Sequence, residues 1–292
     1  MADLAPGAAG AASQAEERAF DFDERDFRRV CRMIHERAGI SLSPHKRDMV
    51  YSRLARRLRV LGMWRVGEYL DHVESAQGAE AQQFVNALTT NLTSFFREGH
   101  HFGVLAEQLR AAHRGDGVLQ IWCCAASTGE EPWSLAITAC EAFGTLTPPV
   151  RILATDIDTH VLQLARRGVY PVERIDALDA ARKRRFFQRG SGANAGLCRV
   201  RPELQALLEF RQLNLCDDDY GLRERYAAVF CRNVMIYFDK PTQYHVLQRI
   251  APLLAPDGRL YAGHSESFNH ASDLVVPCGR TIYRPASTAV RG

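Results

Sequence analysis

The chain has 292 residues, of which 46% are hydrophobic, so it can hold one large domain or two smaller ones around a packed core. A formal net charge of +3 is too small to imply a nucleic-acid partner, and the lack of a signal peptide or a long apolar stretch predicts a cytoplasmic protein with no direct membrane insertion. The eight cysteines form no C-x-x-C pair and no zinc-like Cys/His cluster, so we expect reduced thiols and no metal site.

Residues 1–20 have the Ala/Gly-rich composition of a flexible tail, and residues 21–90 show four short helical patterns that predict a small all-α domain. Gly39 and Gly62 are predicted to end the first two helices, because glycine readily adopts the left-handed conformation of a helix C-terminus. The apolar positions of the four patterns are Phe27, Val30, Cys31, Ile34 and Ala38; Val50, Leu54, Leu58 and Leu61; Tyr69, Leu70 and Val73; and Phe84, Val85 and Leu88.

The second predicted helix is strongly basic, with Arg53, Arg56 and Arg57 among its polar positions. A solvated helix face explains this cluster as well as a docking surface for an acidic partner does. No aromatic residues interleave with the arginines as base stacking would require, so an acidic helical protein is a better candidate than nucleic acid. On the docking interpretation, these arginines contact a protein substrate.

The next stretch, TTNLTSFFREGHH at 89–101, is polar, then doubly aromatic, then charged. A plain linker would rarely carry two phenylalanines beside an arginine. A buried hinge against the following domain is one interpretation. A substrate or cofactor contact is the other, and Asn91, Thr93 and Arg97 supply the hydrogen-bonding groups that it needs.

The stretch IWCCAASTGEEPWS at 121–134 predicts a strand, a tight loop of small residues and a helix, which is the first unit of a nucleotide-binding α/β domain. Ser127 or Thr128 can cap the helix, and the acids Glu130 and Glu131 favour its positive end. The dinucleotide fingerprint is absent, and two carboxylates suit a pyrophosphate badly. They suit a cofactor with an adenosine and a cation, such as S-adenosylmethionine (SAM).

From residue 118 onward, predicted strands and helices alternate, which indicates a mostly parallel sheet. Asp156 follows the second strand of this pattern, where such folds hold ribose hydroxyls. Two short runs after a Gly-rich turn, 197–201 and 208–213, are predicted to be antiparallel strands inserted into the α/β pattern. Further predicted elements are helices over 177–188 and 241–254, a turn at 256–258, and strands over 227–231, 259–262 and 281–284.

Five stretches, in this order, resemble the bacterial chemotaxis receptor methyltransferases, the CheR family. They are NLTSFFRE at 91–98, AASTGEEPWS at 125–134, ATDIDTHVL at 154–162, CRNVMIYFD at 231–239 and LAPDGRLYAGHSESF at 254–268. The resemblance implies an all-α N-terminal domain and a Rossmann-like SAM-dependent methyltransferase domain, here 91–286. It also implies a small antiparallel β subdomain inserted at about 187–213.

The resemblance also implies the site. The cofactor contacts would be Asn91, Thr93, Arg97, Glu131, Asp156, Asn214, Leu215, Arg232 and Asn233. The match favours Glu131 over the adjacent Glu130, and it places Arg97 and Tyr237 nearest to the reacting methyl group. From the sequence alone, Tyr237 reads more readily as an aromatic residue that packs on the core, and the match is what favours a role in the reaction.

The implied reaction is methyl transfer from SAM to glutamate side chains in the cytoplasmic helical region of chemoreceptors, which would recruit the protein to membrane receptor arrays for chemotactic adaptation. A glutamate is already ionised at neutral pH, so no general base is needed. The rivals are a methyltransferase for nucleic acid or a small molecule on the same fold, and a cofactor-binding adaptor without activity. Gly192 and Gly196, in the turn of the inserted strands, are predicted to shape an edge that docks a C-terminal receptor peptide; a structural flap is the alternative.

Overall fold

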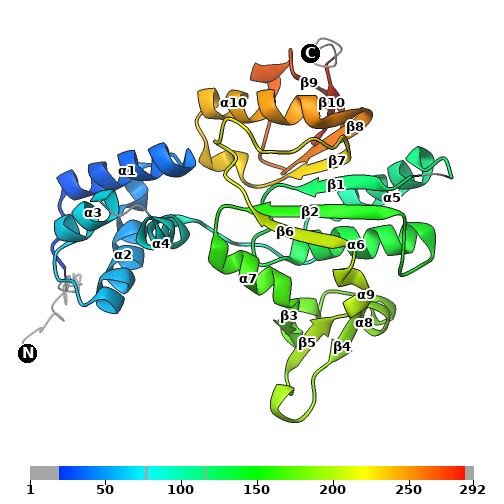
Figure 1. Cartoon of the computed structure of the whole chain (residues 1–292), viewed down its shortest axis with the longest axis horizontal. Helices are drawn as coiled ribbons and strands as arrows, with labels where there is room; N and C mark the ends of the chain where they lie inside the picture. Colours follow the sequence, from blue (N-terminus) through cyan, green and yellow to red (C-terminus); the bar gives the residue numbers. More distant parts are fainter. Residues whose placement is uncertain (1–19, 76–77, 116, 287–292) are drawn as a thin grey trace, which may run out of the picture.

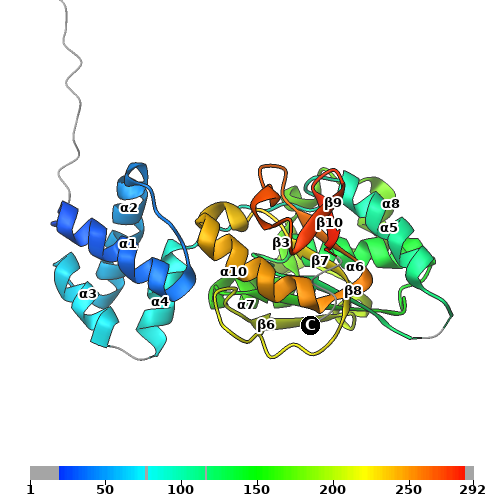
Figure 2. The same cartoon turned by 90° about the horizontal axis from the view of Figure 1, so that it is seen from above.

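The computed structural model describes residues 20–75, 78–115 and 117–286. Figure 1 shows a helical bundle, formed by the first part of the chain, beside a larger α/β domain that carries a small projecting sheet. Seen from above, a single linker runs from the end of the bundle into the α/β domain (Figure 2). The described chain therefore has the α-then-α/β architecture that the sequence predicts.

The bundle consists of α1 (Glu24–Ala38), α2 (Arg47–Leu61), α3 (Val66–Ser75) and α4 (Ala79–Leu88). All four predicted helices are therefore present. Gly39 and Gly62 end the first two with φ of 67° and 66°, as predicted. Phe20 corrects the predicted tail 1–20: it is buried, and its ring lies 6.3 Å from that of Trp64, so it belongs to the bundle. The rest of that tail lies outside the described residues.

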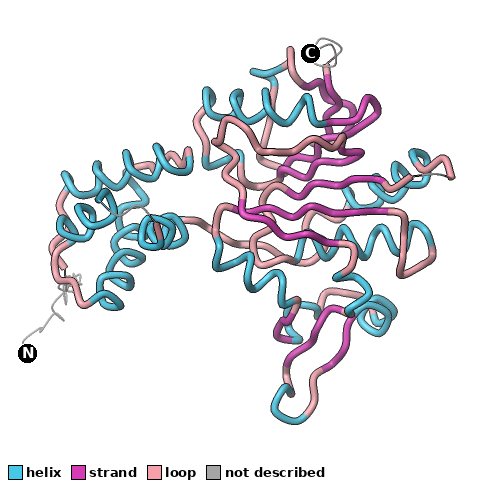
Figure 3. The backbone as a smooth tube through the Cα atoms, viewed as in Figure 1, coloured by secondary structure: helices cyan, strands magenta, loops and turns pink. Residues whose placement is uncertain are grey.

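The large sheet contains, in spatial order, β6 (Leu208–Gln212), β2 (Val150–Asp156), β1 (Leu119–Cys123), β7 (Tyr226–Cys231), β8 (Leu254–Ala262), β10 (Ile282–Pro285) and β9 (Val275–Gly279). The first five strands are parallel to their neighbours, and β10 and β9 close the sheet in antiparallel fashion. The predicted mostly parallel sheet is confirmed (Figure 3). Because the chain runs outward from β1 in both directions, the topological switch point lies at the carboxyl ends of β1, β2 and β7, where such folds bind ligands.

Alternating side chains of the strands divide the interior into two cores. Trp122, Val229 and Leu260 face one side, where α10 (Lys240–Ile250) packs. Ile121 and the other strand residues that alternate with these face the opposite side. That side is covered by α5 (His100–Ala112), α6 (Glu130–Phe143) and α7 (Thr159–Arg167). The first core is continuous with the core of the bundle, so the two domains share buried apolar contacts.

The projecting sheet has the order β3-β5-β4 and is antiparallel, and its strands are β3 (Val169–Pro171), β5 (Leu197–Val200) and β4 (Phe187–Arg189). The run 208–213 was wrongly predicted to belong here. Its residues Leu208–Gln212 form β6, which pairs parallel to β2 because the short helix α9 (Pro202–Gln205) returns the chain to the main sheet. The helix predicted over 177–188 is shorter, since α8 (Ala180–Phe186) ends where β4 begins.

Two further predictions near the C-terminus need correction. The expected turn at 256–258 is an irregularity inside β8, where the register against β7 shifts between Tyr226 and Ala228. Gly258 permits it, because a Cβ there would lie 2.7 Å from the Tyr226 carbonyl oxygen. The helix predicted over 241–254 ends at Ile250, and Leu254 already belongs to β8. Strand β9 carries no clear alternation and was missed.

Candidate functional site

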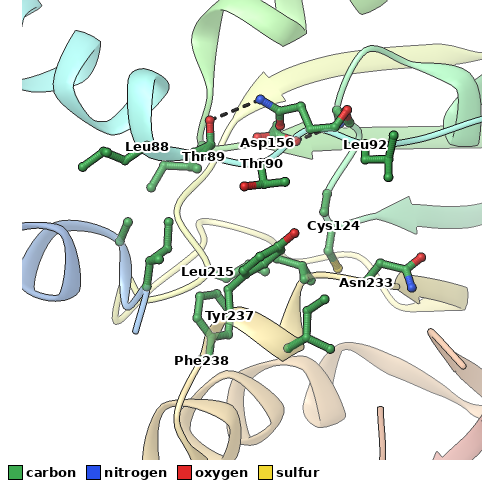
Figure 4. Close-up of a pocket in the computed structure, with 18 of the residues that line it drawn as sticks. Leu88, Thr89, Thr90, Leu92, Cys124, Asp156, Leu215, Asn233, Tyr237 and Phe238 are labelled. Atoms are coloured by element: carbon green, nitrogen blue, oxygen red, sulfur yellow. Dashed lines mark hydrogen bonds between the residues drawn. The ribbon is translucent and has the colours of Figure 1, made fainter. Parts of the chain in front are cut away.

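A cavity of about 540 Å³ lies at the topological switch point, between the α/β domain and the bundle. Its lining includes every residue predicted to contact the cofactor or the reacting methyl group: Asn91, Thr93, Arg97, Glu131, Asp156, Asn214, Leu215, Arg232, Asn233 and Tyr237. Figure 4 shows part of this lining, with Asp156 and the linker on one side and Tyr237 and Phe238 on the other. The volume falls within the roughly 300–1,000 Å³ typical of cofactor pockets.

Asp156, the last residue of β2, is the best-defined polar group of the cavity. Each of its carboxylate oxygens accepts one backbone N–H, from Ser127 at 2.8 Å and from Asp158 at 2.9 Å. A carboxylate oxygen can accept more than one hydrogen bond, so both oxygens can also accept ribose hydroxyls. Burial raises the pKa of Asp156 to about 6, against the effect of these two N–H groups. Hydrogen bonds from further donors, such as ribose hydroxyls, would stabilise the ionised carboxylate.

We expect cofactor affinity to fall as the pH falls through about 6, because protonated Asp156 is a poorer acceptor for the ribose hydroxyls. The direction follows from linkage: hydroxyl groups that donate to the ionised carboxylate lower its pKa, so binding releases protons near this pH. Titration calorimetry at about pH 7.5 and about pH 5 measures the effect. Asp156→Asn is the matched control, and a pH dependence that survives in it would place the titrating group elsewhere.

The loop between β1 and α6 is held in a left-handed conformation at Ser127 (φ 49°) and Gly129 (φ 101°). A Cβ on Gly129 would lie 2.7 Å from the Tyr170 hydroxyl and 2.9 Å from Ala165, so only glycine lets the loop pack this closely. The predicted cap of α6 is wrong: Gly129 occupies the N-cap position, and the Ser127 hydroxyl instead donates to the Asn91 carbonyl at 3.1 Å. Thr128 donates to Glu130 at 2.6 Å.

The two acids at the start of α6 have different surroundings. Glu130 is fully buried, pairs with Arg174 and does not line the cavity. Glu131 lines the cavity and accepts a hydrogen bond of 2.8 Å from Arg232. Burial raises the pKa of Glu131, and the Arg232 charge opposes that rise. Of the two acids, only Glu131 lines the cavity, and its contact with the cofactor stays a prediction.

Arg232 lies beneath the cavity with a fully buried side chain. Besides Glu131, its guanidinium contacts the Arg97 carbonyl at 2.5 Å and Glu98 at 3.5 Å. Its side-chain hydrogen bonds therefore fix the positions of neighbouring residues. The predicted cofactor contact of Arg232 stays a prediction, and because the guanidinium is engaged elsewhere it would have to come from the backbone.

Glu98 was missed by the sequence analysis, although it ends the motif NLTSFFRE. Besides Arg232, it contacts the Asn233 side chain at 3.3 Å and His264 at 3.0 Å. Burial opposes ionisation of Glu98, but the hydrogen bond from His264 and the charge of Arg232 together lower its pKa to about 2. Glu98 is therefore ionised at neutral pH and joins three segments of the site.

Glu266, also missed, is a second buried support. One of its oxygens accepts backbone N–H groups from Asn233 at 3.0 Å and Gly263 at 2.5 Å. It thereby holds Asn233 in a left-handed conformation, with φ of 58°. Four of the five non-glycine residues with positive φ in the described chain lie in segments that build the cavity: Phe96, Glu98, Ser127 and Asn233. Such strain collects at functional sites, where the surroundings determine the backbone.

The linker residues are held by hydrogen bonds from the α/β domain and by one within the linker itself. The Asn91 amide donates to Asp158 at 2.9 Å, and the Thr93 carbonyl accepts from Arg174 at 3.1 Å. The Arg97 guanidinium donates to the Leu92 carbonyl at 3.1 Å. The predicted hinge and the predicted contact surface are therefore the same segment, a fixed strip that forms one wall of the cavity.

The bundle closes the cavity through two groups of contacts. In the last turn of α1, the Arg37 carbonyl accepts from the Asn214 amide at 2.9 Å, and just beyond the helix Ser41 donates its backbone N–H to the Tyr237 carbonyl at 2.8 Å. At the end of α4, Asn86 donates to Thr159 of α7 at 2.9 Å. Tyr237 and Asn214 thus lie at the junction between domains.

The three arginines of α2 differ in their surroundings. Arg53 lines the cavity and donates to the carbonyls of Leu88 and Thr89 at 2.9 and 2.7 Å. Arg57 pairs with Glu80 of α4. Only Arg56 of the three is exposed. Arg53 and Arg57 hold neighbouring parts of the bundle and linker, so they could contact a substrate only in addition to that structural role. Gly192 and Gly196 lie in the turn of the small sheet and do not line the cavity.

Comparison with known proteins decides the family. A profile described as "CheR methyltransferase, SAM binding domain" matches residues 91–283, and one described as "CheR methyltransferase, all-alpha domain" matches residues 25–89. The chain belongs to the CheR methyltransferase family. It is 53% identical over 267 residues to chemotaxis protein methyltransferase 2 of Pseudomonas aeruginosa, covering 91% of this chain and 95% of that one. The chemotaxis protein methyltransferase of Salmonella typhimurium is 51% identical over 258 residues, covering 88% of each chain.

Membership of the CheR family confirms the resemblance and makes this chain a SAM-dependent methyltransferase. The residues that line the cavity fit SAM. They include the Asp156 carboxylate, which could accept the ribose hydroxyls, a second carboxylate at Glu131, and apolar walls that include Leu215. Among the described residues, no group of three or more His, Cys, Asp or Glu side chains could hold a metal ion. No helix of the described segments is long and apolar enough to cross a membrane.

Proposed function

We propose that this CheR-family protein methylates glutamate side chains in the helical cytoplasmic region of chemoreceptors. The observation that carries the proposal is that the carboxylates of the cavity are already engaged: no histidine is among the described residues that line it, Glu131 pairs with Arg232, and Asp156 accepts two backbone N–H groups. The Cys124 thiol is buried, and burial raises its pKa well above the usual range. An acceptor that needs no deprotonation therefore suits this cavity best. A glutamate, with a pKa near ~4.3, arrives already ionised.

When bound, SAM supplies a methyl group that its sulfonium already makes electrophilic. The residues of this chain then have to position the acceptor and exclude water. Arg97 is held through its guanidinium by the Leu92 carbonyl and through its own carbonyl by Arg232, so it can orient a carboxylate from a fixed place. The Tyr237 hydroxyl can donate a hydrogen bond that sets the angle of attack, since this side chain lines the same cavity.

The test is transfer of a radiolabelled methyl group from SAM to a purified receptor cytoplasmic fragment. We expect a base-labile product, which is typical of an ester, and no product when the acceptor glutamates are changed to alanine. RNA, DNA and a receptor fragment are offered in parallel. Methylation of nucleic acid alone would contradict the proposal, and binding of SAM without any transfer would favour the adaptor alternative.

The small sheet supports a second contact with receptors. Within the described chain, β4 pairs only with β5, so its outer edge is free to add a peptide strand. The turn that precedes β5 is well defined: the Gly190 N–H donates to the Leu197 carbonyl at 2.8 Å, and Gly192 and Gly196 have φ of 57° and 85°. We infer that this edge docks the C-terminal peptide of certain receptors and so recruits the protein to receptor arrays.

Deletion of three residues within Ser191–Gly196 should abolish binding of a receptor-tail peptide, because the turn sets the position of the edge strand. Methylation of a tail-less receptor fragment should continue. Fluorescence anisotropy with a labelled peptide measures binding. Gly192→Ala is a milder control, since space around its Cβ is open and only the left-handed backbone is disfavoured. If the intact protein binds no tail peptide, the small sheet is a structural flap.

Arg56→Glu should slow receptor methylation at low salt, and the difference from the wild type should shrink as salt rises, because surface charges are screened over about 8–10 Å at ordinary ionic strength. Arg56 is chosen because Arg53 and Arg57 hold α4 and the linker. Arg28→Glu, at an exposed site on α1, controls for net charge. Equal rates for Arg56→Glu and wild type at every salt concentration would leave α2 with an ordinary solvated face.

A further inference from the structure

Two large hydrophobic side chains at the cavity are exposed. Leu92 is 80% exposed and Ile236 is 49% exposed, and both line the cavity. The other exposed large hydrophobic residues among the described positions, such as Val118 at 48%, do not line it. In Figure 4, Leu92 comes from the linker and lies across the pocket from the segment that carries Tyr237. We call Leu92 and Ile236 the apolar rim.

The rim is held rigidly in its exposed position. Leu92 lies between Asn91 and Thr93, whose side chain and carbonyl are tied to the α/β domain by the hydrogen bonds described above. Ile236 lies in a short 3-10 turn, Met235–Tyr237. That turn is fixed on both sides, because the Gln243 side chain donates to the Met235 carbonyl at 2.9 Å and Ser41 donates to the Tyr237 carbonyl. The hydrogen-bonded backbone therefore holds the Leu92 and Ile236 side chains in their exposed positions.

Each rim residue also adjoins a residue predicted to act on the methyl group. The Leu92 carbonyl accepts from the Arg97 guanidinium at 3.1 Å, and Ile236 directly precedes Tyr237. A segment that delivers an acceptor to Arg97 and Tyr237 would therefore lie close to the rim. A single glutamate side chain cannot cover aliphatic groups that belong to two separate segments. Neighbouring side chains one turn away on a helix can, since residues three and four apart share a face.

We propose that the apolar rim seats the helical receptor segment that carries the acceptor glutamate, and that this contact keeps water away from the carboxylate during transfer. The proposal rests on the proposed function, since it names the same substrate. Burial of two aliphatic side chains favours association. Exclusion of water also matters for the reaction, because a hydrated carboxylate is a weaker nucleophile. The rim thus accounts for binding and for desolvation with the same two residues.

The test compares Leu92→Ser, Ile236→Ser and the double variant with Val118→Ser, which removes an aliphatic residue outside the cavity that is as exposed as Ile236. We expect KM for a tail-less receptor fragment to rise about tenfold or more in the double variant, the loss that burial of two such side chains implies. SAM affinity, measured by calorimetry, should change by less than about twofold, and Val118→Ser should match the wild type. The conservative double variant Leu92→Met with Ile236→Val should keep KM near the wild-type value, because it retains an apolar surface at both positions.

Four outcomes would overturn the inference. An unchanged KM in the double variant, with wild-type methylation intact, would remove the rim and leave the proposed function standing. An equal loss of SAM affinity would make the two residues cofactor walls. A dimer in solution that only the double variant dissociates would assign the rim to a second copy of the chain. If wild-type protein transfers no methyl group to any receptor fragment, the proposed function itself fails, and the rim proposal fails with it.

Discussion

Asp156→Ala should weaken SAM binding by roughly tenfold or more, because it removes two charge-assisted hydrogen bonds to the ribose, each contributing roughly 1.5–3 kcal/mol. The geometry supports a large effect: each carboxylate oxygen already accepts one backbone N–H, which aims its remaining lone pairs at the cavity. Because Asp156 is buried, water in the variant would not readily replace the hydrogen bonds of the lost carboxylate. Titration calorimetry measures the change in affinity directly.

A control is needed because Asp156 also holds the loop at Ser127 through a backbone N–H. Asp179→Ala removes a comparable acid–backbone hydrogen bond, to the Arg182 N–H at 2.8 Å, at the N-cap of α8 and away from the cavity. It should lower Tm modestly and leave SAM affinity unchanged. Unchanged binding in Asp156→Ala, with a cooperative thermal transition, would remove Asp156 from the site.

Arg97→Ala should lower both turnover and SAM affinity, because Arg97 lines the cavity and is predicted to contact both the donor and the acceptor. Loss of a hydrogen bond to a charged group predicts a decrease in turnover of roughly tenfold or more. Arg97→Lys should recover only part of the activity, since a lysine cannot reproduce the planar, bidentate geometry of a guanidinium. Steady-state kinetics on a receptor fragment, together with calorimetry, separates the two effects.

Tyr237→Phe is the matched variant, because it removes one hydroxyl and keeps the ring that packs at the domain junction. Turnover should fall while SAM affinity stays nearly constant, in contrast to Arg97→Ala. This pattern is expected of a group that acts only as the methyl group moves. Full activity of Tyr237→Phe at saturating substrate would reduce Tyr237 to a packing residue.

Local sequence patterns predicted the elements that local physics determines. Gly39 and Gly62 end helices because they adopt positive φ, and Asp156 ends a strand because polar residues follow a buried run at a sheet edge. The candidate cofactor residues, which were taken from motifs spread along the chain, all line one cavity. That convergence follows from the parallel sheet, which brings the carboxyl ends of distant strands together.

What the sequence could not predict depends on partners that are distant along the chain. The charge of α2 looked like a surface, yet Arg57 pairs with Glu80 and Arg53 with carbonyls at the end of α4. The run 208–213 has the pattern of any short strand, and only the path of α9 places β6 beside β2. Glu98 was missed because its partners, Arg232 and His264, lie more than a hundred residues away.

The shared wall of the cavity has a thermodynamic consequence. Because residues of the bundle, among them Ser41 and Arg53, line the same space as Asp156 and Tyr237, a ligand in that space contacts both domains at once. Its binding free energy then contributes to the association of the domains. Linkage makes this reciprocal: a partner that shifts the bundle against the α/β domain changes the affinity for the ligand by the same factor by which the ligand changes the affinity for that partner. A cofactor that contacts both walls would therefore make the helical bundle contribute to its binding free energy.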